Sequence, residues 1–173
     1  SDESGQLSLS LHAGATVEEA HAAARDPERL LVVETSPAYP RTRGLAPEHP
    51  HRIPLSAVDV WIESDAEPTE LPDPPPGEVE QAIARNVAPF IEPGSTLQTG
   101  IGGVPNAVVA LLAESAGGDF GIHSEMFTDG LMRLHEAGAV SNRKGVFDGV
   151  SITTFAMGSR TLYDWLDERE DVA

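Results

Sequence analysis

The chain has 173 residues, of which 40% are hydrophobic, and its 28 acidic residues outnumber 11 basic ones to give a formal net charge of -17. This length suffices for one good core or two small lobes, and the apolar content disfavours a chain that is disordered throughout. Because such an acidic surface repels polyanions, we expect neither nucleic acid nor an anionic membrane as a partner.

Cysteine is absent and Lys144 is the only lysine. Without cysteine the chain has no disulfide and no thiolate metal site, and we expect a cytoplasmic protein. It contains no run of eighteen apolar residues and no basic and apolar N-terminal segment, which predicts neither a membrane span nor a signal peptide. The scarcity of lysine indicates a halophilic protein, whose self-repulsion is screened by salt. A merely soluble acidic protein is the alternative.

The first 63 residues predict a strand, a helix and two further strands. Residues 6–12 alternate leucine with polar residues, as half-buried strands do. Thr16 and Glu19 have the spacing of a capping box, which predicts a helix through the alanines that follow. Residues 30–35 are a continuous apolar run of the kind buried in parallel sheets. Residues 58–63 predict one more strand.

Residues 36–55 are rich in proline and predict a long irregular loop. The loop holds the densest positive cluster of the chain, namely Arg41, Arg43, His49, His51 and Arg52. Two interpretations remain open: a surface loop that balances nearby acidic charge, or a contact to an anionic ligand or partner. The two histidines predict no metal site, because no third ligand is spaced with them.

Residues 64–77 are acidic, rich in proline and poor in apolar side chains, which is the composition of an interdomain linker. A helix is predicted over residues 78–90, with Val79, Ile83 and Val87 on one face. The chain therefore predicts two α/β units joined by a linker.

A glycine turn opens the second unit. A strand beginning near Leu97 leads to Gly100, Gly102 and Gly103, where the backbone can approach a ligand closely. Pro105 suits the first position of the helix that follows. The spacing lacks the third glycine of a dinucleotide fingerprint, and the chain has no phosphate-binding P-loop motif. The free N–H groups of the helix start suit an anion or an oxyanion, whereas a tight turn alone would also explain the glycines.

A second strand is predicted over residues 120–123, after a helix that Gly117-Gly118 would end. Glu125 is expected where this strand stops. Ligands of open parallel sheets lie outside the carboxyl ends of the strands. Glu125 and the glycine turn are therefore predicted at the same edge of one sheet.

The neighbours of Glu125 predict no other chemistry. His123-Ser-Glu125 matches half of a zinc deaminase motif, but the cysteines of the other half are missing, so metal is not expected. His123 is predicted to be a packed strand histidine. Ser124 lacks a paired base for a serine triad, and Asp129 could be a charge in the first turn of a helix.

The remaining chain predicts a helix from about Met126 to Gly138, a strand within residues 149–158, and a last helix capped by Ser159. Each half then offers about three strands, fewer than a parallel sheet usually has. We therefore expect two incomplete units that belong to a longer protein.

Several segments together carry a family resemblance. They are Pro40-Arg-Thr-Arg-Gly44, residues 97–108 (Leu-Gln-Thr-Gly-Ile-Gly-Gly-Val-Pro-Asn-Ala-Val), residues 121–130 (Gly-Ile-His-Ser-Glu-Met-Phe-Thr-Asp-Gly), Thr154-Phe-Ala-Met-Gly158 and Leu162-Tyr-Asp164. In this order they closely resemble the acetyl-CoA hydrolase/transferase family, and its 4-hydroxybutyrate CoA-transferase branch (butyrate/acetate type) looks most similar.

The resemblance implies two α/β domains and a protein more than twice this length. Residues 1–63 would be the C-terminal part of the first domain, residues 64–77 the linker, and residues 78–173 the N-terminal part of the second domain. A Gly-Gly-Gln-x-Asp-Phe type segment, which in the family helps to build the CoA and oxyanion site, is missing. We also expect a homo-oligomer, a dimer or larger.

The resemblance also implies the chemistry. Glu125 would be the nucleophile that forms a glutamyl-CoA thioester, and Gln98 would orient the acyl group. The CoA, acyl and oxyanion contacts would come from Gly100, Ile101, Gly102 and Gly103. The expected substrates are an acyl-CoA and a small carboxylate such as acetate, with coenzyme A as substrate and no permanently bound cofactor. An acyl-CoA hydrolase on the same fold and a catalytically incomplete fragment are the alternatives.

Overall fold

The computed structural model describes residues 5–71, 74–115 and 117–173. Its α-helices are α1 (Thr16–Ala23), α2 (Glu78–Val87), α3 (Gly103–Glu114), α4 (Asp129–Glu136) and α5 (Arg160–Leu166). Its strands are β1 (Gln6–Ser8), β2 (Val32–Thr35), β3 (Arg52–Pro54), β4 (Val60–Glu63), β5 (Thr96–Leu97), β6 (Gly121–Phe127) and β7 (Ile152–Ala156). Two 3₁₀ turns, η1 (Leu55–Ala57) and η2 (Ala88–Phe90), follow β3 and α2.

The strands form three small sheets. β1 pairs with β3 in antiparallel orientation, β2 pairs with β4 in parallel, and β5, β6 and β7 form a parallel sheet in that order. The chain is therefore a mixed α/β protein with small parallel sheets, as predicted. The antiparallel pair is a correction, because β3 lies within residues 36–55, where we expected an irregular loop. Its short length explains why no alternating pattern revealed it.

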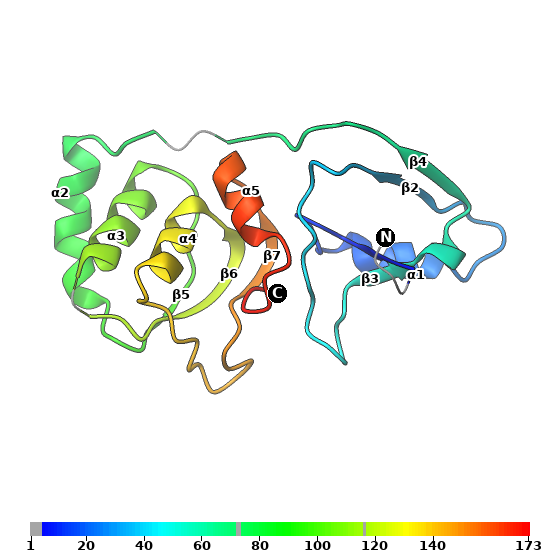
Figure 1. Ribbon diagram of the computed structural model, residues 1–173. Coiled ribbons are helices and arrows are strands. Elements are labelled where there is room, and N and C mark those ends of the chain that lie inside the picture. The colour runs from blue at the N-terminus through cyan, green and yellow to red at the C-terminus, as the bar shows by residue number, and fades with distance from the viewer. Residues whose placement is uncertain (1–4, 72–73, 116) are drawn as a thin grey trace.

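The hydrophobic core lies almost wholly in the second part of the chain. Helices α2, α3 and α4 lie side by side next to the β5–β6–β7 sheet (Figure 1). The largest fully buried apolar side chains of this core are Phe120, Ile122, Phe127, Leu131, Leu134, Leu162 and Tyr163. The core fixes the strand ends of this sheet, and with them the residues of the candidate site.

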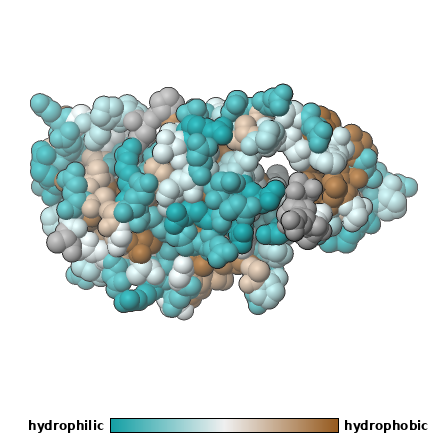
Figure 2. Space-filling view, in the orientation of Figure 1, coloured by the Kyte–Doolittle hydropathy of each residue, from teal (hydrophilic) through white to brown (hydrophobic). Residues whose placement is uncertain are grey.

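The β2–β4 ribbon, at the other end of the molecule, is poorly covered. We expected residues 30–35 to be buried, but of these only Leu31 is. The exposed apolar side chains of the ribbon are Val32, Val60, Trp61 and Ile62, each 42–47% exposed. Figure 2 shows a brown patch at this end of the molecule. Parallel strands are normally covered on both faces, and within the described residues this ribbon is not.

Backbone pairing and the linker join the two parts. Residues 11–13 run along β7 and form backbone hydrogen bonds of 2.8 and 2.9 Å with it. The linker passes α5 on its way from β4 to α2 (Figure 1). There the Tyr163 hydroxyl donates to the Thr69 carbonyl at 2.7 Å. The two parts therefore share contacts beyond the single covalent connection.

The predictions for helix starts fared differently. Thr16 is the first residue of α1 and Ala15 is its N-cap, so the predicted capping box is wrong. Pro105 is the third residue of α3 rather than the first. The cap of α5 is confirmed, because the Ser159 hydroxyl accepts the Leu162 N–H at 3.3 Å.

Two predicted helix boundaries are also corrected. Helix α3 ends at Glu114, before the predicted Gly117-Gly118 stop, and Ser115 already has an extended backbone. Helix α4 begins at Asp129 rather than near Met126, because Met126 still pairs with Phe155 of β7. The strand that carries Glu125 is therefore longer than the sequence suggested.

Candidate functional site

Glu125 lies inside β6, two residues before the strand ends at Phe127, which corrects the expectation that the strand stops at Glu125. Its side chain is exposed. Its backbone N–H donates to Gln98 Oε1 at 3.0 Å. The structure thus brings together two of the predicted site residues, one from β6 and one from the residue that follows β5.

The predicted glycine turn follows directly on Gln98. Gly102 is the N-cap of α3 and has a φ of 126°, a conformation that favours glycine. A Cβ at Gly103 would lie 2.7 Å from Cγ of Glu80, so close packing against α2 explains this glycine. A Cβ at Gly100 would meet no described atom within 4 Å. Of the three, Gly100 therefore has the most open surroundings.

A pocket of about 360 Å³ opens beside this turn, at the carboxyl ends of β5, β6 and β7. Its walls are Leu71, Pro74, Ile101, Gly102, Asn106, Thr128, Asp129, Met157 and Gly158. This is the edge at which open parallel sheets bind ligands, and the volume lies at the small end for ligand pockets. The lining is mainly apolar, which suits an aliphatic group better than a phosphate.

Of two neighbours of Glu125, His123 differs from its prediction and Asp129 agrees with it. His123 is exposed rather than packed, and its ring meets Phe147 edge-on at 6.5 Å between centroids. Asp129 starts α4 as allowed for, but it is only 5% exposed. One carboxylate oxygen of Asp129 accepts the Ser159 N–H at 2.9 Å and the other accepts the Ser159 hydroxyl. Asp129 therefore fastens α4 to the start of α5.

Comparison with known proteins decides the family. No family model matches the chain. The chain is 39% identical over 145 residues to the 4-hydroxybutyrate coenzyme A transferase of Clostridium kluyveri, covering 83% of this chain and 32% of that protein. It is 38% identical over 168 residues to the succinyl-CoA:cyclohexane-1-carboxylate CoA transferase of Geobacter metallireducens, covering 96% and 36%.

Solved structures agree with the sequence comparison. The crystal structure of RipA from Yersinia pestis matches with a TM-score of 0.88 at 31% identity, over 99% of this chain and 37% of RipA. The 4-hydroxybutyrate CoA-transferase of Porphyromonas gingivalis matches with a TM-score of 0.85 at 32% identity, over 99% and 41%. The chain belongs to the acetyl-CoA hydrolase/transferase type of CoA-transferases. This CoA-transferase segment spans about a third of the length of its curated relatives.

A second constellation in this CoA-transferase segment has the order of a hydrolytic triad. Asp171 Oδ2 lies 3.4 Å from His135 Nδ1, and His135 Nε2 lies 2.8 Å from Ser151 Oγ. Ser151 is fully buried and also accepts the Asn142 side-chain N–H at 3.0 Å. A nucleophile must reach its substrate, so this cluster is a buried brace. Burial lowers the pKa of His135, which favours its neutral form.

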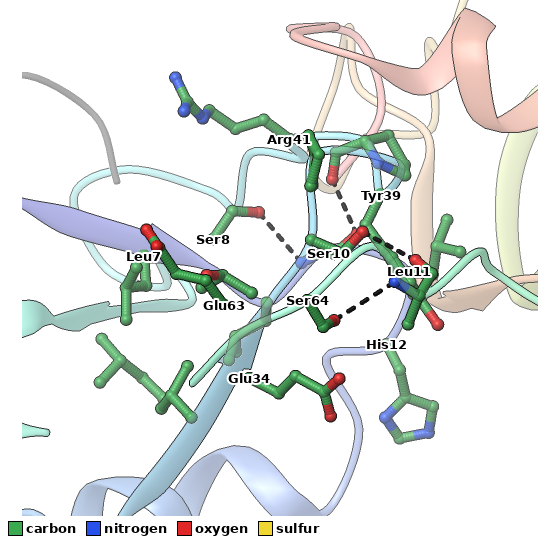
Figure 3. Close-up of a pocket in the computed structure, with 18 of the residues that line it drawn as sticks. Leu7, Ser8, Ser10, Leu11, His12, Glu34, Tyr39, Arg41, Glu63 and Ser64 are labelled. Carbon is green, nitrogen blue, oxygen red and sulfur yellow. Dashed lines mark hydrogen bonds between the residues drawn. The ribbon is translucent and has the colours of Figure 1, made fainter. Parts of the chain in front are cut away.

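A second cavity, of about 970 Å³, lies between the first part and the Asp167–Glu168 turn. Figure 3 shows side chains of β1, of the segment after β2 and of the start of the linker around it. Its charged walls are Glu34, Glu63, Asp167 and Glu168 against Arg41. None of the predicted site residues lines it, and its acidic walls would repel the phosphates of CoA. We therefore place the candidate site at Glu125.

The basic loop pairs with the second part of the chain. Arg41 and Arg43 reach Glu168 at 3.1 and 2.7 Å, and Arg43 also reaches Glu170 at 2.8 Å. The hydrogen bond from Arg43 holds the pKa of Glu168 below its usual value. These contacts favour the interpretation that the loop balances local acidic charge.

Two further findings concern membrane spans and metal sites. None of the helices in the described ranges is long and apolar enough to cross a membrane. In residues 5–71, 74–115 and 117–173, no three His, Asp or Glu side chains gather as a metal ion would require.

Proposed function

We propose that the full-length protein carrying this chain is a CoA-transferase whose nucleophile is Glu125. It would move CoA between an acyl-CoA and a small carboxylate such as acetate. The observation that carries the proposal is the exposed Glu125 carboxylate on β6, with its backbone held by Gln98 at the start of the glycine turn. The two curated relatives named above support it, because both are named as CoA-transferases.

The chemistry needs a carboxylate and no metal. A Glu125 oxygen would attack the thioester carbonyl, forming a C–O bond while the C–S bond breaks and its electron pair leaves with the CoA thiolate. The thiolate would then attack the glutamyl carbonyl of the mixed anhydride, forming a C–S bond and releasing the donor carboxylate. The resulting glutamyl-CoA thioester would react with the acceptor by the same two steps in reverse. Each exchange is easier than one direct transfer.

The glycine turn would stabilise the negative charge that develops on the carbonyl oxygen. Backbone N–H groups from Gly100 to Gly103 are the proposed donors, and one well-placed donor of this kind is worth about 3 kcal/mol. Gln98 Oε1 accepts the Glu125 N–H, and the amide N–H groups of Gln98 would orient the acyl group. The pocket beside Ile101 would receive an aliphatic part of the substrate.

We also propose the domain boundaries of the sequence analysis, with residues 1–63 and 78–173 in successive CoA-transferase domains joined by residues 64–77. Two observations support this: apart from the pairing of residues 11–13 with β7, none of the three sheets contains strands from both sides of the linker, and the core cluster starts at Ala84. The relatives are about three times as long as the matched region. We therefore propose that the full-length polypeptide is active. These residues alone are proposed to be a catalytically incomplete segment.

A hydrolase differs only in the acceptor, because water instead of a carboxylate would reach the reactive glutamyl species. Five relatives named as CoA-transferases favour transfer. Measuring CoA release from butyryl-CoA with and without acetate separates the two. Transfer predicts acetyl-CoA as the product and little free CoA when acetate is omitted.

The test of the nucleophile uses the full-length protein incubated with acyl-CoA and then with borohydride, which reduces a glutamyl-CoA thioester. Peptide mapping should place the reduced residue at Glu125. Glu125→Gln should lower exchange by at least about 10³-fold, while Glu92→Gln, an exposed turn carboxylate, should leave it unchanged. A Glu125→Gln protein that still exchanges CoA would overturn the assignment.

A further inference from the structure

Side chains, rather than backbone pairing alone, hold the peptide groups around Glu125. The β5–β6 ladder consists of two register pairs, Thr96 with Gly121 and Leu97 with Ile122. Beyond it, the Gln98 amide oxygen accepts the Glu125 N–H at 3.0 Å. Beyond the end of the β5–β6 ladder, a side chain therefore accepts the backbone N–H that strand pairing would otherwise satisfy.

Ser124 makes the second such connection. It is 2% exposed, and its hydroxyl oxygen accepts the Thr99 N–H at 3.2 Å. The same oxygen lies 3.2 Å from the Thr99 carbonyl and 2.7 Å from the Met126 carbonyl, to either of which it can donate its proton. Thr99 directly precedes Gly100. One buried hydroxyl thus ties the start of the glycine turn to the residues on both sides of Glu125.

Thr153 makes the third connection, from the opposite neighbour β7. Its hydroxyl lies 3.1 Å from the Glu125 carbonyl oxygen and 3.0 Å from the Phe155 carbonyl oxygen, and its single proton is shared between them. The Glu125 peptide groups are therefore held from both sides, the N–H by Gln98 and the C=O by Thr153.

We infer that the hydroxyls of Ser124 and Thr153 are positioning groups that hold Glu125 in register with the glycine turn. This inference rests on the proposed function. Carbonyl attack needs the reacting atoms about 3–3.5 Å apart, and a misplacement of about 1 Å can cost about 10²-fold in rate. Both hydroxyls form their hydrogen bonds with backbone groups. Their loss therefore lowers the rate of thioester formation and leaves substrate binding nearly unchanged.

The experiment measures the single-turnover rate of glutamyl-CoA formation, together with kcat and KM, in the full-length protein. Thr153→Val keeps the side-chain shape without the hydroxyl and should lower that rate about tenfold, with KM within about twofold of the parent. Thr153→Ser keeps the hydroxyl and should restore most of the rate. Thr161→Val makes the same change on an exposed position of α5 and should match the parent.

Ser124→Ala should lower the same rate by at least as much, because it also removes the hydrogen bond that holds the Thr99 N–H. Its melting temperature must be measured alongside, since it leaves the Thr99 N–H without its partner. Equal losses in Thr153→Val and Thr153→Ser, or a raised KM at unchanged kcat, would overturn the positioning role. If Glu125→Gln retains exchange, the proposed function itself fails. If Glu125→Gln is inactive while Thr153→Val is as fast as the parent, only this inference fails.

Discussion

Residues 5–63 and residues 78–173 contain the same kinds of element but differ in what covers them. In the second region, β5, β6 and β7 pack with α2, α3 and α4 around one continuous core. In the first, the buried aliphatic side chains of the described residues are Leu7, Leu31 and Ile53. The apolar residues of β2 and β4 lie half open to solvent.

The difference separates what an apolar pattern predicts from what it does not. Residues 30–35 read as a buried strand, and residues 32–35 do form one, paired in parallel with β4. Burial, however, requires a second layer, and α1 leaves much of this ribbon uncovered. A pattern therefore predicts the element, while its stability depends on the layers that pack against it.

The largest predicted effect tests this contrast directly. Leu134 on α4 is fully buried, so Leu134→Ala should lower the free energy of unfolding by about 3 kcal/mol through lost contacts and a cavity. Ile62→Ala, on the half-exposed ribbon, should cost less than about 1 kcal/mol. Urea titrations of both variants measure the two losses. Equal losses would mean that the ribbon is as well covered in solution as the core.

The candidate site shows how far the sequence reaches. The sequence predicted a glycine turn and a strand with Glu125 at the same edge of one sheet. In the structure Gln98, just before that turn, contacts Glu125, because β5 and β6 are parallel neighbours. The sequence did not predict the roles of Ser124 and Thr153. These partners lie 25 and 28 residues from the groups that they bind, so their contacts depend on strand register.

Other polar contacts escaped prediction for the same reason. Asp129 and Ser159 are 30 residues apart and meet only because β6 and β7 end side by side. The brace of Asn142, Ser151 and His135 likewise depends on where the chain re-enters the sheet. Predicted element boundaries were wrong where a local pattern competed with strand pairing. Met126, for example, was predicted to begin a helix but pairs with Phe155 of β7.

A smaller effect is the pH dependence of the free energy of unfolding, which involves residues of the second region alone. Burial is the main reason why the pKa of His135 is lowered, while Asp171 acts against it and Arg169 adds to it. The unfolded chain therefore binds a proton below about pH 6.5 before the folded chain does. The free energy of unfolding should fall as the pH drops from about 6.5 through the lower folded pKa.

Denaturant titrations between pH 7.5 and 5, a range set by the ordinary histidine pKa of about 6.5, measure this dependence. His135→Gln has no group to protonate here and should flatten this part of the profile. Asp171→Asn removes the carboxylate that favours the charged ring, so the fall should extend to lower pH. A profile that is the same in His135→Gln and in the parent would contradict the assignment.

The smallest effect should come from the ion pairs that join the two regions. Arg43 bridges from the first region to Glu168 and Glu170 of the second. Exposed pairs contribute little and are screened by salt, with a Debye length of about 3 Å at 1 M. Because Arg43 lowers the pKa of Glu168, the pairing contributes above the ordinary carboxyl pKa and is lost as the pH falls through the folded value. We therefore expect Arg43→Ala to loosen the coupling between the regions while leaving each one folded.

Each region carries one tryptophan, Trp61 in the first and Trp165 in the second, so Trp61→Phe and Trp165→Phe backgrounds report on each separately. At low salt, Arg43→Ala should move the two unfolding midpoints apart, and in 1 M NaCl the parent should behave like the variant. Arg29→Ala is the matched control, because its 2.8 Å pair with Glu19 lies within the first region and does not connect it to the second. If Arg29→Ala separates the midpoints as much as Arg43→Ala does, the coupling arises from charge balance in the acidic chain rather than from the junction. If neither variant separates the midpoints, the backbone contacts of residues 11–13 with β7 are what makes the two regions unfold together.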